Sequence, residues 1–194
     1  MEQSFWQSRY DIKDTGWNIG NVSTPIKEYL DQLQNKELKI LIPGCGYGYE
    51  AIYAHKLGFK NVFVLDFVAE PLDILRKNCP DFPENHILQA DFFKHEEKYD
   101  LIIEQTLFCA IDPKDREKYA KKVSQLLNPE GKLVGLLFNR DFESGPPFGG
   151  STAEYQQLFS SHFNNISIED CYNSIEKRKG TEVFVELKNE PVTH

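Results

Sequence analysis

The 194-residue sequence has few cysteines, and none is placed as in a zinc site or a redox pair. Its four cysteines, Cys45, Cys79, Cys109 and Cys171, form no C-x-x-C pair and have no histidine nearby at metal-ligand spacing. We therefore expect reduced thiols, no metal and a cytoplasmic protein. The chain also lacks a G-x-S-x-G nucleophile elbow and a Walker lysine loop, so it shows no sign of the hydrolase or phosphate-loop chemistry that those motifs carry.

Long hydrophobic runs and an excess of basic residues are also missing. No apolar run approaches the roughly 20 residues needed to span a bilayer, and residues 1–10 lack the basic-then-apolar order of a signal peptide. Against 30 Asp and Glu there are only 22 Lys and Arg, which gives a net charge of −8. Because clustered Lys and Arg supply most of the affinity for nucleic acid, we expect no nucleic-acid partner. Because no apolar run is long enough, we expect no membrane span.

What is present indicates one α/β domain over residues 1–194, and we expect it to be a monomer. Short apolar runs alternate with amphipathic stretches from Leu38 onward, a pattern typical of βαβ units. The expected strands are residues 38–42, 62–65, 86–89, 101–103 and 132–138, followed by a terminal antiparallel hairpin of 166–172 and 181–187. The expected helices are residues 25–34 capped by Thr24, 49–57, 68–78, 113–127 capped by Asp112, and one capped by Ser151 that runs to about residue 162. Together these elements predict a seven-stranded mixed sheet with helices on both faces, built from residues 37–194, behind an N-terminal segment of residues 1–36.

A glycine-rich turn joins the first predicted strand to the next helix. Gly44, Cys45, Gly46 and Gly48 give G-x-G-x-G spacing, which lets the backbone approach a ligand at a helix N-terminus. The dinucleotide fingerprint G-x-G-x-x-G fails, because Gly48 follows Gly46 by only two residues. The spacing is similar to that of class I S-adenosylmethionine-dependent methyltransferases, which have a Rossmann-like fold. The alternative is a turn that binds no ligand.

Acidic residues end the next two predicted strands, where open α/β sheets bind ligands. Asp66 stands 22 residues after Gly44 and is placed to accept hydrogen bonds from a ribose diol. Asp91 and Phe92 close the third strand and could offer adenine an acceptor and an aromatic ring. The alternatives are a helix cap at Asp66, and a turn residue followed by core aromatics at Asp91.

The chain resembles the thiopurine S-methyltransferase family, and more closely its thiol and halide methyltransferase branch, from about residue 5 to 187. The matching residues are Trp6-Gln7-Ser8-Arg9-Tyr10, Thr15-Gly16-Trp17-Asn18, Thr24-Pro25, residues 41–51, Asp91-Phe92-Phe93, Phe108-Cys109-Ala110-Ile111, Asp112-Pro113, Asp115-Arg116, Gly145-Pro146-Pro147-Phe148 and Arg178-Lys179-Gly180.

The resemblance implies that Trp6, Tyr10 and Trp17 belong to a helical, aromatic lid over the cofactor. Trp6 and Tyr10 are spaced i, i+4, so they share a helix face that could wall in an adenosine and a sulfonium. The alternative is that they plug an open edge of the domain. Arg116 matches a family arginine at the active-site rim, or is an exposed residue of its helix, and Tyr119 is expected to line the same pocket.

Two departures from the branch pattern fall near the expected site. Asn18 replaces an Asp, and Glu104-Gln105 replaces a common Asp-Tyr pair. We expect Glu104 to contact the cofactor or the acceptor, and we assign it with Arg116 to the catalytic site.

The resulting expectation is transfer of a methyl group from S-adenosylmethionine, without a metal, to a small soft nucleophile such as a thiol, hydrosulfide or halide. A methyltransferase acting on thiopurines or on other small S- or O-acceptors is the first alternative. A non-catalytic cofactor-binding protein is the second, and it would need no aromatic lid.

Overall fold

The computed structural model describes residues 2–189, which build a single seven-stranded sheet in the order β3-β2-β1-β4-β5-β7-β6. Strand β7 runs antiparallel to both its neighbours, whereas the pairs among β1 to β5 are parallel. The predicted mixed sheet with a terminal antiparallel hairpin is therefore confirmed. The strands are β1 (Lys39–Pro43), β2 (Asn61–Asp66), β3 (Ile87–Gln89), β4 (Tyr99–Gln105), β5 (Leu127–Phe138), β6 (Asn165–Asp170) and β7 (Glu182–Lys188).

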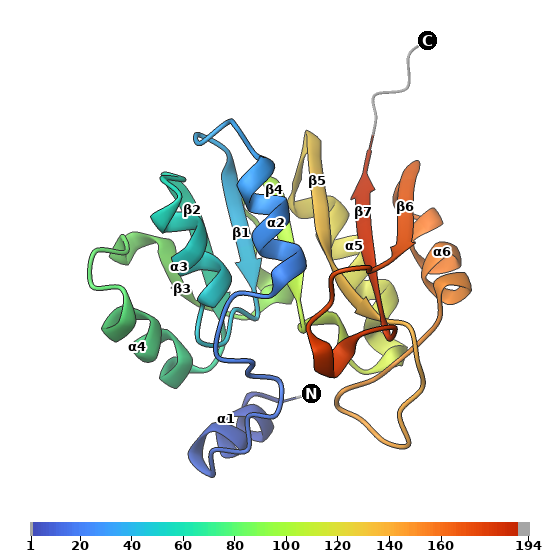
Figure 1. Cartoon of the computed structure of the whole chain (residues 1–194), viewed down its shortest axis with the longest axis horizontal. Helices are drawn as coiled ribbons and strands as arrows, with labels where there is room; N and C mark the ends of the chain where they lie inside the picture. The colour runs from blue at the N-terminus through green and yellow to red at the C-terminus, as the bar shows by residue number, and fades with distance from the viewer. Residues whose placement is uncertain (1, 190–194) are drawn as a thin grey trace.

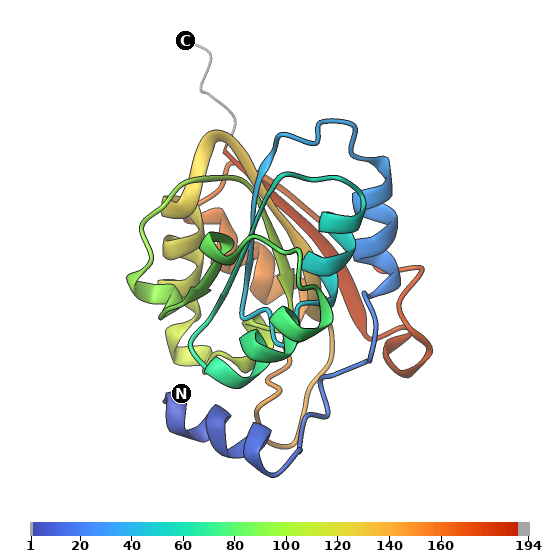
Figure 2. The ribbon, with the colours of Figure 1, turned by 90° about the vertical axis from the view of Figure 1, so that its left-hand side faces the viewer.

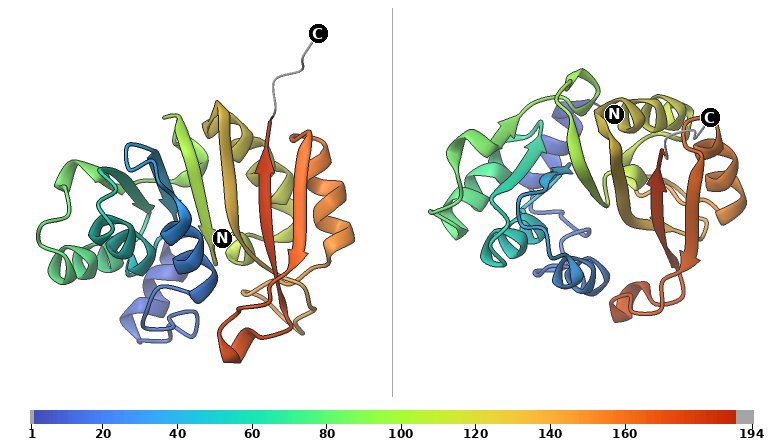
Figure 3. Two further views of the ribbon diagram at one scale, coloured as in Figure 1. Left: turned by 45° about the horizontal axis from the view of Figure 1, so that its top comes forward. Right: turned by 90° about the horizontal axis from the view of Figure 1, so that it is seen from above.

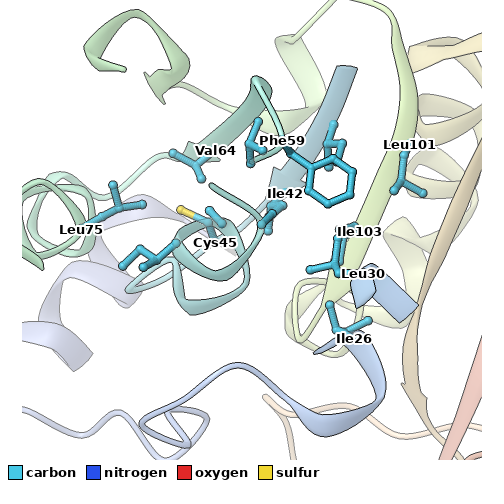
Figure 4. Close-up of a cluster of buried hydrophobic side chains, with 14 of the residues drawn as sticks. Ile26, Leu30, Ile42, Cys45, Phe59, Val64, Leu75, Leu101 and Ile103 are labelled. Atoms are coloured by element: carbon cyan, nitrogen blue, oxygen red, sulfur yellow. The ribbon is translucent and has the colours of Figure 1, made fainter. Parts of the chain in front are cut away.

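Helices cover both faces of this sheet (Figure 3). On one face α2 (Thr24–Gln32), α3 (Tyr49–Lys56) and α4 (Ala69–Asn78) enclose the apolar cluster drawn in Figure 4. On the other face α5 (Arg116–Leu126) and α6 (Thr152–Ser160) pack on a second cluster. Strands covered on both faces need no polar alternation, and the Ile and Leu side chains of β1 are at most 1% exposed. Each such burial contributes roughly 1.5–3 kcal/mol to stability.

Two predicted helix starts are confirmed by hydrogen bonds. The Asp112 carboxylate accepts from the Lys114 backbone N–H at 3.1 Å and opens a 3-10 turn that leads into α5. Ser151 and Glu154 form a reciprocal capping box at the start of α6. Both contacts satisfy backbone N–H groups that the first helical turn leaves unpaired.

Other predicted boundaries were wrong. Thr24 does not cap α2, because the helix begins at Thr24 and follows Ser23, whose hydroxyl bonds to the Gln105 side chain at 3.2 Å instead. Strand β4 is longer than the predicted residues 101–103 and includes Glu104 and Gln105. Strand β5 starts at residue 127 rather than 132, since its first residues pair with β4 beyond a register shift.

The N-terminal helix α1 (Gln3–Asp11) lies apart from both helix layers, beneath the carboxyl ends of the parallel strands (Figures 1 and 2). It is attached to the end of β2 by a 2.6 Å hydrogen bond from the Gln3 amide to the Phe67 carbonyl. The segment that follows α1 returns to the sheet through Ser23, whose backbone N–H donates to the buried Glu50 carboxylate at 3.1 Å. Among residues 2–189 no helix combines the length and apolar character that a membrane span requires.

Candidate active site

A cavity of about 1260 Å³ opens between α1 and the carboxyl ends of the parallel strands. Its walls come from segments far apart in the sequence, because these strand ends meet at one edge of the sheet. The cavity is lined by the Gly44 end of the glycine turn, the ends of β2 and β3, and the loop that follows β4. Residues that line it include Trp6, Arg9, Tyr10, Trp17, Gly44, Asp66, Asp91, Phe92, Thr106, Cys109, Phe138, Pro146, Pro147 and Arg178.

The glycine turn has a left-handed backbone at each of its three glycines. The φ angles of Gly44, Gly46 and Gly48 are 59°, 51° and 70°. Gly44 lines the large cavity, whereas Cys45 and Gly46 line a second pocket of about 40 Å³ behind the turn, together with Glu50 and Gln105. Gly48 lines neither pocket and is instead the N-cap of helix α3.

Asp66 lies at the end of β2, and its carboxylate bonds to the glycine turn on one side and to the residue before α4 on the other. One carboxylate oxygen accepts from the Gly46 N–H at 3.1 Å, and the other accepts from the Val68 N–H at 3.0 Å. Burial raises the pKa of this carboxyl to about 6, although these backbone donors oppose the shift. Each carboxylate oxygen keeps a second lone pair, so Asp66 can still accept a hydrogen bond from a molecule in the cavity.

Asp91 and Phe92 also reach the cavity, and Asp91 combines this position with a structural contact. Its carboxylate accepts from the Phe93 N–H at 2.9 Å and caps the following 3-10 turn. The Phe92 ring is 6% exposed and lies 5.5 Å from the Tyr119 ring. Asp91 and Phe92 therefore line the cavity and, at the same time, form a capped turn that carries a core aromatic ring.

The predicted lid residues form one aromatic cluster over the glycine turn. The ring centroids of Trp6 and Trp17 are 5.3 Å apart, and those of Tyr10 and Trp17 are 5.5 Å apart. Tyr10 is 5% exposed, and its hydroxyl would lie 3.5 Å from a Cβ atom added at Gly46. Edge-to-face packing of this kind orients the rings. The segment thus covers the turn with aromatic surface.

Arg178 joins the lid to the far side of the sheet and also lines the cavity. Its guanidinium donates to the Trp17 carbonyl at 3.2 Å, pairs with Glu182 at 3.3 Å and lies 5.5 Å from the centre of the Phe138 ring. Sequence reasoning quoted Arg178 within the family motif but assigned it no role. The basic run 177–179 was the available signal, and only the folded chain shows which of its side chains turns inward.

Three predicted site residues lie behind the cavity wall. Glu104 is fully buried, and its carboxylate accepts from the Phe108 N–H at 2.9 Å and from the Tyr119 hydroxyl at 2.5 Å. Tyr119 is 1% exposed and does not line the cavity, contrary to expectation. The reason is that α5 packs this ring onto the sheet, where it bonds to the inward-facing carboxylate.

Arg116 is likewise turned away from the cavity. Its guanidinium donates to the Gly149 carbonyl at 2.8 Å and lies 4.5 Å from the centre of the Phe108 ring. These contacts fix the loop that carries Pro146 and Pro147, two residues that do line the cavity. The residue is 8% exposed, so the alternative of a solvated arginine on the helix surface was wrong.

Comparisons with known proteins agree with this geometry. The model of the thiopurine S-methyltransferase family matches residues 1–193. The chain belongs to this family. It is 32% identical to the probable thiol methyltransferase 2 of Arabidopsis thaliana over 97% of this chain and 86% of that protein. It is 29% identical to thiocyanate methyltransferase 1 of Brassica oleracea over 94% of this chain and 83% of that protein.

The solved structures show the same fold. The Burkholderia thailandensis 1,6-didemethyltoxoflavin-N1-methyltransferase superposes with a TM-score of 0.75 at 16% identity, covering 97% of this chain and 87% of that one. This member of the thiopurine S-methyltransferase family is therefore an S-adenosylmethionine-dependent methyltransferase with the class I, Rossmann-like fold. The alternative of a non-catalytic binding protein is wrong.

The cavity has the groups that S-adenosylmethionine requires. Asp66 would accept hydrogen bonds from the ribose hydroxyls, and the glycine turn would let backbone approach the ligand without side chains between them. Trp6 and Trp17 offer aromatic surface to a sulfonium. The Arg9 side chain also lines the cavity, where its guanidinium would face the cofactor.

The buried position of Glu104 predicts a pH effect on stability. Burial raises the pKa of this carboxyl from its ordinary 4.5 to about 7, so between these values the folded enzyme holds a proton that the unfolded chain has lost. The free energy of unfolding should therefore fall as the pH rises from 4.5 to 7, by up to about 3 kcal/mol. In Glu104→Gln, urea denaturation across this range should show a smaller decline. If the free energy of unfolding depends on pH in the same way in both proteins, the raised pKa does not belong to Glu104.

The lid should become more ordered when the cofactor binds. Tyr10 is the buried residue of helix α1, and Ile12 just beyond the helix is 71% exposed, so a bound molecule would add contacts to a segment that buries little of its own surface. Hydrogen exchange of amides 6–17 should slow on adding S-adenosylhomocysteine, whereas the amides of α6 should be unaffected. Equal exchange of residues 6–17 with and without the cofactor would show that this segment is a fixed plug.

Proposed function

We propose that this enzyme methylates a small, soft and preferably anionic nucleophile, such as hydrosulfide, another thiolate, thiocyanate or a halide. The observation that carries the proposal is the composition of the cavity wall. Arg178 lies there near the ring of Phe138, and the cations of the wall also include Arg9 and four lysines, whereas among residues 2–189 no histidine lines the cavity. Without a histidine base, the best acceptors are nucleophiles that are already ionised near neutral pH.

The chemistry favours such a wall. Bound S-adenosylmethionine supplies an electrophilic methyl group on a positively charged sulfur. Transfer to an anion neutralises charge, so aromatic surface that replaces water around the reactants assists it. The residues of the lid and the loop 145–148 would align the two reacting atoms, which can remove roughly 7–11 kcal/mol of the barrier at best. The names of the plant relatives, a probable thiol methyltransferase and a thiocyanate methyltransferase, support this acceptor class.

Roles for the residues behind the wall follow from their contacts. We assign Arg116 to positioning the proline-containing loop, and Glu104 to holding Tyr119 and the turn at Phe108. Asp66, Asp91, Phe92, Gly44 and the lid aromatics would bind the cofactor. The buried thiols, including Cys45 and Cys109, fit a reducing compartment, and we propose a monomeric cytoplasmic enzyme that acts on no nucleic acid.

A thiopurine or another larger acceptor is the second candidate. The cavity volume of about 1260 Å³ exceeds the roughly 300–1,000 Å³ of ordinary small-molecule sites, so space remains beside a bound cofactor. The name of the family also includes this acceptor class.

The test compares the pH dependence of different acceptors. With a simple thiol the rate should rise with the fraction of thiolate, whereas with iodide, which has no proton to lose, it should be nearly flat over the same range. Product methyl sulfide and methyl iodide can be measured in the headspace. One enzyme pKa shared by both acceptors, and lost in Glu104→Gln, would indicate a protein base.

A matched pair of variants separates the site from general charge effects. Arg178→Gln removes a buried cation of the cavity wall and should lower kcat/KM for the anions about 10-fold to 100-fold, as expected for loss of a charged contact. Lys177→Gln removes the same charge from an exposed neighbouring residue and should leave kcat/KM for the anions unchanged. If none of these anions is methylated while a phenol or a carboxylate is, the proposed acceptor class is wrong and the methyltransferase assignment remains.

A further inference from the structure

A second group of chemically active side chains lies outside the methyltransferase cavity. His55 is in the last turn of α3, Cys79 directly follows α4, and Asp81 stands two residues later. The Nε2 atom of His55 is 3.2 Å from one oxygen of Asp81, and the Sγ atom of Cys79 is 3.3 Å from the other. One ligand atom from each residue lies within 4.8 Å of the other two, and none of the three residues lines the cavity.

The three donors are an imidazole nitrogen, a sulfur and a carboxylate oxygen, which is a donor set that zinc prefers. Around tetrahedral zinc, metal–ligand distances of about 2.0–2.3 Å place neighbouring donor atoms about 3.3–3.8 Å apart. The separations of 3.2 Å and 3.3 Å run to different Asp81 oxygens, and with one oxygen per carboxylate the three donor atoms lie within 4.8 Å of one another, so small side-chain rotations would close the site around an ion. We propose that His55, Cys79 and Asp81 bind one Zn²⁺ ion, with water as the fourth ligand.

Packing holds two of the three donors before any ion arrives. Cys79 is 3% exposed, and the turn around it is fixed by a 2.9 Å hydrogen bond from its N–H to the Leu75 carbonyl and a 3.0 Å bond from the Phe82 N–H to its own carbonyl. The Phe82 ring lies 5.3 Å from the His55 ring. Side chains ordered in advance lose less entropy on binding. The Asp81 side chain is 80% exposed and leaves a path for the ion.

Binding has a defined proton balance. The Cys79 S–H bond breaks as the Zn–S bond forms, and the proton goes to the buffer, while His55 binds through a neutral ring nitrogen and Asp81 as a carboxylate. The ion would join the end of α3 to the turn after α4, and so would pin two helices of the same layer together. The site lies apart from the cavity, so the proposal is independent of the identity of the methyl acceptor.

Zinc competition with a chromophoric chelator tests the proposal on the full-length enzyme. The expected result is one ion per chain with release of one proton. Substitution by Co²⁺ should give a thiolate-to-cobalt charge-transfer band in the near ultraviolet. Cys79→Ser and His55→Gln should each weaken zinc binding at least tenfold and Cys79→Ser should abolish the band.

Two controls match these variants in chemistry. His162→Gln removes another histidine–carboxylate pair, in which His162 Nε2 lies 2.6 Å from a Glu117 oxygen, and Cys171→Ser removes another buried thiol. Both should bind zinc as the wild type does. If Cys79→Ser fails to fold, Asp81→Asn decides, because its side chain is exposed: zinc should raise the Tm of the wild type and not that of Asp81→Asn. Absence of stoichiometric binding, or binding that none of the three variants weakens, would overturn the proposal.

Discussion

Replacing Asp66 with alanine is expected to weaken the binding of S-adenosylhomocysteine by about 1.5–3 kcal/mol, the range for losing a charged hydrogen-bond acceptor. The same change removes the acceptor of the Gly46 and Val68 N–H groups, so the free energy of unfolding should also fall. Calorimetric titration measures the first effect and urea denaturation the second. Asp73→Ala is the matched control, because that carboxylate is 70% exposed and pairs with Arg76 on the surface.

The titration of Asp66 gives this prediction a second readout. With a pKa of about 6, the carboxyl is mostly protonated at pH 5 and mostly ionised at pH 7.5. A protonated carboxyl accepts fewer hydrogen bonds, so cofactor affinity should be about tenfold lower at pH 5. Asp66→Asn cannot ionise and should show a flatter profile. Affinity in Asp66→Ala equal to that of the wild type would mean that the carboxylate does not touch the cofactor.

Replacing Gly48 with alanine should destabilise the enzyme by roughly 2–5 kcal/mol, which combines the costs of a left-handed backbone and of overpacking. Its φ is 70°, and an added Cβ would collide with the Leu75 Cδ1 atom of α4. The collision must displace the buried Leu75 side chain, and with it α4 or the start of α3, unless Leu75 changes rotamer. Activity should therefore fall together with stability.

Gly58→Ala separates these two causes. Gly58 has a φ of 86°, but nothing lies within 4 Å of a Cβ added there. Alanine at this position meets only the backbone cost, roughly 1–2 kcal/mol, and should leave the cofactor site unchanged. Denaturation midpoints of the two variants give the difference. An equal loss of unfolding free energy in both variants would show that the residues around Gly48 accommodate the added Cβ at no cost.

The order of apolar runs and turns in the sequence was sufficient to predict the sheet, its mixed character and the edge that holds the site. Strands buried on both faces read as continuous apolar runs, and the glycine turn with Asp66 marks the edge at which parallel strands end. These features are local, so they can be recognised without knowing which distant segments pack against them. The lid aromatics were found through spacing and resemblance.

Only the tertiary structure decided which polar side chains reach the cavity. Successive residues of a strand point to opposite faces, so β4 directs Glu104 towards Tyr119 of α5 and Gln105 towards Ser23 beside α2. The sequence shows the two residues side by side but does not show which face each one meets. Likewise, Arg178 reaches Trp17 across 161 residues, and His55 meets Asp81 across 26. Such contacts depend on long-range packing, which no local pattern records.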